Sequence, residues 1–282
     1  MTVAVVTDST AYLPDDVAMA HAVTVVPLVV VINDGEGREG IEVTPSDVAK
    51  ALNARRVVVT TSRPAPSAFE AAYRGLLDAG ATGIVSVHLS RELSGTLEAA
   101  VLAAAGFADK VTVVDSRGTA MGLGFPTLLA AAAAASGKDL AGVREAALAA
   151  IDRITTLFYV DTLEYLRRGG RIGAASALLG TALSVKPILS FTDGAIELRE
   201  KVRTASRALG RLVDLAVESA EESDVDVAVH HLGSPERAAQ LLETLAKRLG
   251  SRLRDQYVSE IGAAVAAHVG PGFAGIVVHR RP

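Results

Sequence analysis

The 282-residue chain contains no cysteine and no tryptophan, and aromatic residues make up only 4% of it. The absence of cysteine excludes disulfides and thiol chemistry, although it does not by itself identify the redox compartment. Half of the residues are apolar, so the interior has to be built from Val, Leu, Ile and many Ala side chains. Such a core is compatible with helices packed closely on a β-sheet.

The chain also lacks a strong charge bias and the common cofactor motifs. Lys and Arg number 28 against 32 Asp and Glu, which gives a formal net charge of -4 without a long run of one sign, so a nucleic-acid surface is not indicated. No G-x-x-x-x-G-K-[ST] loop occurs, and Gly118, Gly122 and Gly124 do not have the G-x-G-x-x-G spacing. The six histidines show no metal-ligand spacing. We therefore expect neither a cofactor nor a metal.

Signals for export or membrane insertion are weak. Thr2 to Val6 lacks a basic n-region and a cleavage pattern, and therefore predicts a first strand rather than a signal peptide. The uncharged stretch from Gly118 to Gly137 has the length of a membrane span, but it consists mainly of Ala and is interrupted by Gly and Pro126. Ala supplies little of the apolar transfer energy that a span requires. We expect a cytoplasmic protein without a membrane span.

The first half of the chain alternates short β-branched runs with helical stretches rich in Ala and Leu. Continuous apolar strands separated by helices indicate a parallel sheet covered on both faces. Thr44-Pro45-Ser46-Asp47 offers an N-cap residue, a Pro at the first helical position and an acidic residue in the first turn. The expected strands are Val3 to Val6, Val23 to Ile32, Val57 to Val59, Ile84 to Val87 and Val111 to Val114.

The pattern changes near Ile154. Thr192-Asp193-Gly194 has the residues of a hairpin turn, and Ile172 to Leu183 is an almost uncharged segment that we expect to be helical. We predict an α/β fold with two domains, residues 1–154 with a parallel sheet and residues 155–282 of α+β type. The other expected elements are strands at Ile154 to Val160, Val185 to Phe191, Ala195 to Arg199, Val225 to His230 and Phe273 to Val278, and helices at Thr162 to Arg168, Glu236 to Leu249 and Gly262 to His268.

Four hydroxyl-rich turns follow strands in the first half. In an open parallel sheet, ligands bind beyond the carboxyl ends of the strands, so these turns should meet there. Hydroxyls and backbone N–H groups at a helix N-terminus attract anions, and Gly95 would let a ligand approach the backbone closely. Any one of these Ser or Thr residues could instead be a simple helix cap. Lys is absent from the turns, which favours a carboxylate over a polyphosphate as the ligand. The four turns are Thr7 to Thr10, Thr60 to Ser62, Ser90 to Thr96 and Asp115 to Arg117.

A hydrolase remains as an alternative function. Ser94 could act as nucleophile, His268 as base and Asp115 as the residue that orients the base, which would make the protein an esterase or thioesterase. However, Ser94 lacks the G-x-S-x-G elbow. His268 and Arg171 each have an ordinary structural interpretation as well, as a buried donor and as a solvated helix end.

Taken together, the motifs resemble the DegV family from end to end. Each motif is weak alone, but their order and spacing over nearly the whole chain make chance agreement improbable. They are Thr7-Asp8-Ser9-Thr10-Ala11, Thr61-Ser62 followed by Pro64, Leu93-Ser94-Gly95-Thr96, Asp115-Ser116-Arg117 with Met121-Gly122-Leu123-Gly124, Arg168-Gly169-Gly170-Arg171, Lys186-Pro187-Ile188-Leu189, Lys201-Val202-Arg203, and His268-Val269-Gly270-Pro271-Gly272.

The resemblance implies a DegV-like fold of two domains with a long-chain fatty acid bound between them in an apolar tunnel. It also implies a lipid-binding protein without catalysis of its own, which presents the acid to a separate ATP-dependent fatty acid kinase subunit. Arg203 matches the position implicated in docking that partner. The residues that would bind the carboxylate are Thr61, Ser94, Gly95, Thr96, Arg171 and His268.

Two positions depart from the family pattern. Arg63 stands where the family usually has Gln, and Arg91 stands where it usually has a small residue. The rim of the head-group site is therefore expected to be more basic in this chain.

Overall fold

The computed structural model describes residues 2–54, 57–178 and 185–282. The chain forms two compact units, of which unit 1 comprises Met1–Val29 and Thr61–Asp152, and unit 2 comprises Val30–Thr60 and Arg153–Pro282. The division expected from the sequence, 1–154 and 155–282, assigned residues 30–60 to the first domain, whereas these residues cluster with the second. The chain passes from unit 1 into unit 2 and back without a Pro- or Gly-rich linker, so its composition does not reveal these crossings.

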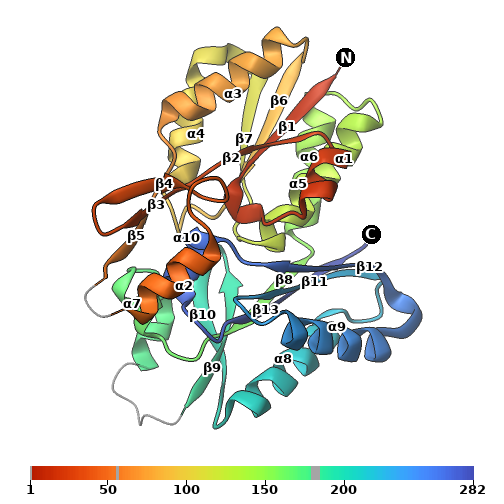
Figure 1. Cartoon of the computed structure of the whole chain (residues 1–282). Coiled ribbons are helices and arrows are strands. Elements are labelled where there is room, and N and C mark those ends of the chain that lie inside the picture. The colour runs from red at the N-terminus through yellow and green to blue at the C-terminus, as the bar shows by residue number, and fades with distance from the viewer. Residues whose placement is uncertain (1, 55–56, 179–184) are drawn as a thin grey trace. The chain divides into compact units, whose positions relative to one another are not determined.

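Unit 1 is built on a parallel sheet, as the sequence predicts. Its strands lie in the order β2-β1-β6-β7 and all neighbouring pairs are parallel (Figure 1). The carboxyl ends of these strands therefore lie at one edge of the sheet. The strands are β1 Val3–Asp8, β2 Val23–Val26, β6 Gly83–His88 and β7 Val111–Asp115.

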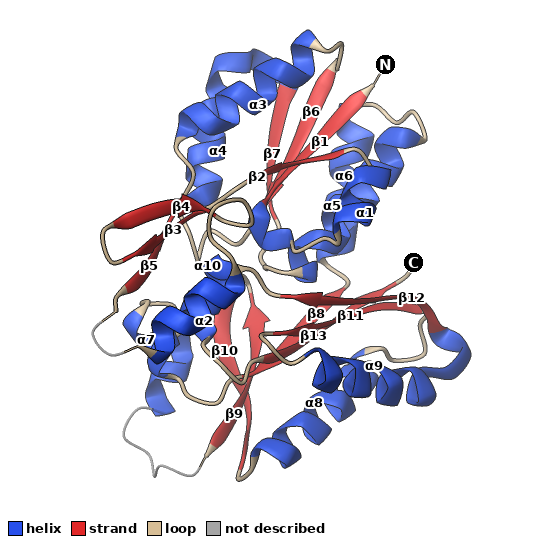
Figure 2. Ribbon diagram, in the orientation of Figure 1, coloured by secondary structure: helices blue, strands red, loops and turns tan. Residues whose placement is uncertain are grey.

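Helices cover both faces of this sheet (Figure 2). One face packs against α5 and α6 through a cluster that includes Val5, Val85 and Leu123, and the other packs against α3 and α4 through a cluster that includes Val6, Phe69 and Ile84. No helix among the described residues is long and apolar enough to cross a membrane. The helices are α1 Asp15–Ala20, α3 Pro66–Asp78, α4 Thr96–Ala104, α5 Met121–Ala135 and α6 Leu140–Ile151, with 3₁₀ turns at Ser9–Ala11 and Ala105–Lys110.

The long strand expected over Val23 to Ile32 is wrong as a single element. The structure breaks it at Pro27 into β2 and β3 (Val29–Ile32), and the two strands belong to different sheets. Proline has no N–H to donate to a strand neighbour. The N–H of Leu28 donates instead to Oγ of Ser9 at 2.9 Å, so the break fixes the loop that follows β1.

A small sheet of three strands contains β3, in the order β4-β3-β5. The added strands are β4 (Gly35–Arg38) and β5 (Val59–Ser62). Thr60 to Ser62 therefore belong to a strand, and the prediction of a turn there is wrong. Helix α2 (Pro45–Asn53) begins as predicted, since Thr44 Oγ1 accepts the N–H of Asp47 at 3.3 Å and an Asp47 carboxylate oxygen accepts the N–H of Thr44 at 3.0 Å.

Unit 2 carries a mixed sheet of six strands in the order β10-β9-β8-β13-β11-β12. Its pairs are antiparallel except for the parallel pair β11 and β12. The strands are β8 Ile154–Tyr159, β9 Lys186–Thr192, β10 Ala195–Val202, β11 Val225–His231, β12 Leu253–Glu260 and β13 Ala274–Arg280. Strand β12 was not predicted, because this edge strand carries charged residues on its exposed positions.

The predicted hairpin between β9 and β10 is confirmed. Asp193 and Gly194 both have positive φ, 48° and 85°, which is the backbone of a tight two-residue hairpin turn. One face of the sheet is covered by α8 (Ala205–Ser219) and α9 (Pro235–Leu249), whose Leu212 and Leu245 are fully buried. Both helices lie along the same side of the sheet in Figure 2.

Short helices complete unit 2. They are α7 Glu164–Arg168 and α10 Ala263–Val269, with 3₁₀ turns at Gly173–Leu178 and Gly250–Arg252. The helix expected over Ile172 to Leu183 lies partly outside the described residues, and its described part is a 3₁₀ segment.

Candidate functional site

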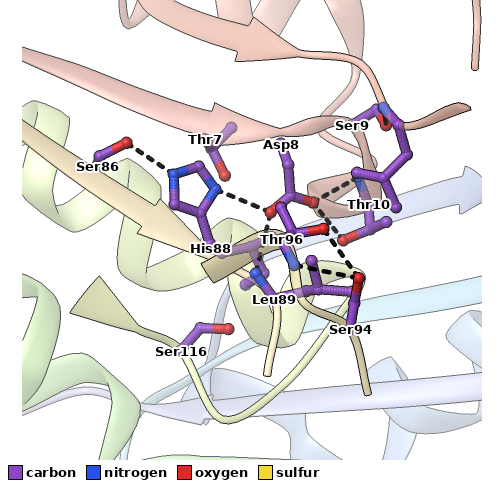
Figure 3. Close-up of polar contacts among 12 residues, drawn as sticks. Thr7, Asp8, Ser9, Thr10, Ser86, His88, Leu89, Ser94, Thr96 and Ser116 are labelled. Atoms are coloured by element: carbon purple, nitrogen blue, oxygen red, sulfur yellow. Dashed lines mark hydrogen bonds and ion pairs between the residues drawn. The ribbon is translucent and has the colours of Figure 1, made fainter. Parts of the chain in front are cut away.

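Three of the four predicted hydroxyl turns meet at the carboxyl edge of the sheet of unit 1 (Figure 3). The turn after β7 donates from Ser116 N to the carbonyl of His88 at 2.9 Å, and the turn after β6 donates from Ser90 N to the carbonyl of Gly118 at 2.9 Å. The loop after β1 joins them, since Thr10 accepts the N–H of Ala120 at 2.7 Å. Thr61, from the fourth segment, also belongs to unit 1 but lies in β5.

Asp8 organises this edge. Its carboxylate is fully buried and accepts four hydrogen bonds, two on each oxygen. Oδ1 accepts from the backbone N–H and the hydroxyl of Thr10 at 3.0 and 2.6 Å, and Oδ2 accepts from Nδ1 of His88 and the N–H of Leu89, both at 3.0 Å. These bonds compensate the desolvation of a buried charge and fix the loops after β1 and β6 relative to each other.

The contact with His88 continues into a buried chain of hydrogen bonds. The Tyr73 hydroxyl donates to Oγ of Ser86 at 2.8 Å, and Ser86 lies 2.7 Å from Nε2 of His88. Because the Ser86 hydroxyl accepts from Tyr73, its own hydrogen is donated to Nε2 of His88. Nδ1 of His88 then carries the hydrogen that is donated to Asp8. Burial raises the pKa of Tyr73 to about 12, so its hydroxyl stays a donor.

This series of buried hydrogen bonds was not predicted from the sequence. Ser86 and His88 point to the same face of β6 because side chains alternate along a strand, but the sequence does not show which neighbouring strand supplies the carboxylate. The series Ser86, His88 and Asp8 has the residue types of a hydrolase triad. All three side chains are 0% exposed, so no substrate can reach Ser86 in this conformation. We therefore interpret these hydrogen-bonded side chains as a support for the loop that follows Asp8.

Ser94, Gly95 and Thr96 end the loop after β6, and Ser94 and Gly95 are partly exposed. Oγ of Ser94 lies 2.9 Å from Oγ1 of Thr96 and accepts the N–H of Thr96 at 3.3 Å. Thr96 is fully buried and begins α4, with Gly95 as the N-cap residue. Hydroxyls beside the N–H groups of a helix N-terminus can bind an anion. These three predicted carboxylate-binding residues are consecutive in the sequence, and the structure leaves Ser94 and Gly95 partly accessible but buries Thr96.

Two arginines differ in their pairing: Arg91 lies in the loop after β6, and Arg63 lies between β5 and α3. Nε of Arg91 donates to the carboxylate of Asp115 at 3.0 Å, so the charge of Arg91 is paired. The Arg63 guanidinium lies over Gly95, where an added Cβ would come within 2.5 Å of Nη1. Within the described part of the chain, the Arg63 side chain has no ion pair.

The hydrolase alternative gains no support from Asp115. Besides Arg91 of the loop after β6, this carboxylate accepts the N–H of Arg117 in the loop after β7 at 2.9 Å, so both of its oxygens are engaged. Ser94 belongs to unit 1 and His268 to unit 2. Oγ of Ser94 forms its hydrogen bonds with Thr96 of the same loop.

In unit 2, His268 lies against the Gly-Gly turn that follows α7. A Cβ on Gly169 would come within 2.1 Å of Nδ1 of His268, so only glycine allows this approach. Arg171 donates to the carbonyl of Gly169. Burial, with the charge of Arg171 as a smaller cause, lowers the pKa of His268 to about 4. At neutral pH the ring is therefore an uncharged donor or acceptor next to a permanent cation.

The segment after His268 packs on the same region through two further glycines. Gly270 has a φ of +70°, and a Cβ there would come within 2.2 Å of the Tyr165 ring. Gly272 has a φ of +86° and lies directly against the carboxylate of Asp161. At the other end of α10, the buried Glu39 carboxylate accepts the N–H of Ala264 at 2.7 Å. Helix α10 is thus fixed at both ends, and this holds His268 in place.

Arg203, the expected docking residue, is exposed and follows the last residue of β10. Thr204 then caps α8 by accepting the N–H of Arg207 at 3.2 Å. Nothing in the described residues assigns a partner to this position. Groups of three or more potential metal-ligating side chains are absent from the part of the chain that the structure describes.

Known proteins resemble the chain over its whole length. Residues 2–281 match the model of a family described as "Uncharacterised protein, DegV family". A DegV domain-containing protein of Streptomyces coelicolor is 52% identical over 282 residues, with 99% of each chain covered. The structure of a DegV family protein from Thermus thermophilus, described by its fatty acid binding, has a TM-score of 0.94 at 34% identity and full coverage of both chains. DegV of Bacillus subtilis, described as a fatty acid binding protein, has a TM-score of 0.90 at 32% identity, again with full coverage of both chains.

Proposed function

The chain belongs to the DegV family, and on that basis we propose that it binds one long-chain fatty acid. The observation that carries the proposal is the hydroxyl cluster of unit 1 in a chain whose similar structures, from Thermus thermophilus and Bacillus subtilis, are described as fatty acid binding. Residues assigned to the carboxylate are Thr61, Ser94, Gly95, Arg171 and His268, while the predicted Thr96 is fully buried and supports the site through its hydrogen bond to Ser94. The acyl chain occupies an apolar tunnel.

General physical chemistry indicates how much of the binding free energy comes from the acyl tail and how much from the head group of the fatty acid. Burial of each methylene contributes about 0.8 kcal/mol, so a chain of sixteen carbons supplies most of the affinity. The head group determines orientation, because a buried carboxylate without hydrogen-bond partners is costly. Hydroxyl donors and the Arg171 guanidinium satisfy a singly charged head group without a metal. The protein needs no cofactor of its own.

We propose further that the protein is a cytoplasmic lipid carrier that presents the acid to a separate ATP-dependent fatty acid kinase subunit. In this role the chain contributes no catalysis. The exposed Arg203 contacts that partner. Arg203→Ala should leave lipid affinity unchanged and lower the rate of phosphorylation by the partner, whereas an equal loss of both would contradict the assigned roles.

The first experiment is to denature the protein purified from a bacterial host and measure extracted fatty acids by mass spectrometry. A control protein prepared identically gives the background. We expect about one fatty acid per chain, because a tail that buries many methylenes dissociates slowly. Absence of lipid, repeated after incubation with fatty acids of several lengths, would refute fatty acid binding.

The second experiment tests the head-group residues. Thr61→Ala combined with Ser94→Ala should weaken binding of hexadecanoic acid at least tenfold, since each hydrogen bond to a charged group contributes roughly 1.5–3 kcal/mol. Ser219→Ala combined with Thr244→Ala is the matched control, because these hydroxyls donate to helix carbonyls at 2.8 Å in unit 2. The same variants also test the esterase alternative, since turnover of aryl esters that Ser94→Ala abolishes would favour catalysis.

A further inference from the structure

The Arg63 side chain lies against Gly95 of the hydroxyl cluster and has no ion pair among the described residues. It follows β5 and precedes the buried Pro64, so its backbone is held between a strand and the start of α3. Its side chain extends over Gly95. A Cβ at residue 95 would lie 2.5 Å from Nη1, 3.1 Å from Cδ and 3.4 Å from Cζ of Arg63. The guanidinium therefore lies directly on the backbone between Ser94 and Thr96.

The glycine at residue 95 is not required by its backbone conformation. Its φ of -72° and ψ of 15° are accessible to any residue. What glycine provides at this position is the space over its Cα, and the Arg63 side chain fills that space. A larger residue at this position would push the flexible Arg63 side chain away from the backbone.

Arg91, in the loop that carries Ser94 and Gly95, provides an internal comparison. Its Nε is 3.0 Å from Asp115, so its charge is largely compensated. No acidic side chain forms an ion pair with Arg63 in the described ranges. A guanidinium without an ion pair among the described residues is available to an anionic ligand, and its planar fork of N–H donors suits carboxylates and phosphates.

We propose that Arg63 is a specificity-determining residue that contacts the ligand head group and selects it by charge. This inference rests on the proposed function, because it assumes that the Ser94 and Thr96 cluster binds the head group of a lipid. Coulomb attraction grows in proportion to ligand charge, so a doubly charged phosphate head gains more from Arg63 than a carboxylate, and a neutral alcohol gains nothing.

The test compares three ligands with the same tail: hexadecanol, hexadecanoic acid and hexadecyl phosphate. Each is titrated into delipidated full-length protein at low salt. In Arg63→Gln we expect affinity to fall about tenfold for the phosphate and about threefold for the acid, with hexadecanol unchanged. Arg63→Lys should retain most of the affinity for the phosphate because it keeps the charge.

Arg91→Gln is the matched control, since it removes the same charge from the same group of loops. It should change every affinity by less than about twofold, because an exposed ion pair contributes little. Gly95→Ala leaves the net charge intact but displaces the guanidinium, and it should reduce the preference for the phosphate. Raising the salt to about 1 M should shrink the effect of Arg63→Gln, because the Debye length falls to about 3 Å.

The outcomes separate this inference from the proposed function. If the wild-type protein binds hexadecanoic acid and loses it in the Thr61→Ala, Ser94→Ala variant, but Arg63→Gln behaves like Arg91→Gln, the role of Arg63 is refuted and the lipid site stands. Equal losses for all three ligands in Arg63→Gln would also refute selection by charge. If the wild-type protein binds none of the three, both the site and the role of Arg63 are refuted.

Discussion

The two candidate regions of the molecule are organised by different kinds of interaction. In unit 1, the buried Asp8 carboxylate gathers the loops by accepting four hydrogen bonds. In unit 2, three glycines allow His268, Tyr165 and Asp161 to come close to the backbone. The first region depends on groups that are present, and the second on Cβ atoms that are absent. Loss of a hydrogen-bond donor or acceptor should therefore destabilise unit 1, whereas addition of one methyl group to a glycine should destabilise unit 2.

The largest expected effect is at the centre of unit 1. Asp8→Ala removes one acceptor group and leaves the donors of Thr10, His88 and Leu89 without it in a buried region. We expect the free energy of unfolding to fall by about 3–5 kcal/mol, as measured by urea denaturation. Asp34→Ala, an exposed position, is the control. A loss below about 1 kcal/mol in Asp8→Ala would show that the hydrogen bonds are not the organising interaction.

The corresponding change in unit 2 adds a single carbon. Gly270→Ala forces a Cβ to within 2.2 Å of the Tyr165 ring at a φ of +70°. The expected destabilisation is about 2–4 kcal/mol, from steric overlap together with backbone strain. Gly250→Ala is a close control, because Gly250 has a φ of +58° with no atom near the added carbon. Equal losses in both variants would mean that strain alone, and not packing, explains the glycine at residue 270.

The pH dependence of stability should come mainly from histidines of unit 2. Burial lowers the pKa of His268 and of His230 to about 4, below the unfolded value near 6.5. The unfolded chain therefore binds more protons between these two values, and stability falls as the pH decreases through this window. Between pH 7.5 and 5.0 we expect His268 to contribute a loss of about 1–2 kcal/mol. His268→Gln should flatten the curve of unfolding free energy against pH, and an unchanged slope would contradict this.

The smallest effect is expected at the far end of the chain of hydrogen bonds in unit 1. Tyr73→Phe removes one donor to Ser86 and keeps the ring in the core. The free energy of unfolding should fall by about 1 kcal/mol. Lipid affinity should not change, because Ser86, His88 and Asp8 can keep their own hydrogen bonds. A loss of more than about 3 kcal/mol would indicate that the chain acts as one cooperative network.

Much of the local structure could be predicted from the sequence. Thr44 and Asp47 form the predicted helix cap, and Asp193 and Gly194 form the predicted hairpin turn. The residues after β1, β6 and β7 gather at one edge as predicted, because the carboxyl ends of parallel strands lie together. The errors came from single positions, such as Pro27, which divides a run of β-branched residues into two strands.

The supporting residues of the site could not be predicted in this way. His88 and Asp8 are 80 residues apart, and their contact depends on β1 and β6 being neighbours in a particular register. Gly169 and Arg63 look like an ordinary helix end and an ordinary surface cation in the sequence. Their roles appear only when His268 and Gly95 are brought beside them.

Features that depend on a few consecutive residues follow from the sequence alone: the strands of unit 1, the helix cap, the hairpin turn and the hydroxyls at the strand ends. The tertiary structure decided which charges are paired, which glycines make room for a side chain, and that residues 30–60 join unit 2. The physical reason is that local structure follows from steric limits and hydrogen bonds within a short segment. Burial and pairing instead depend on distant segments that compete for the same space and the same donors.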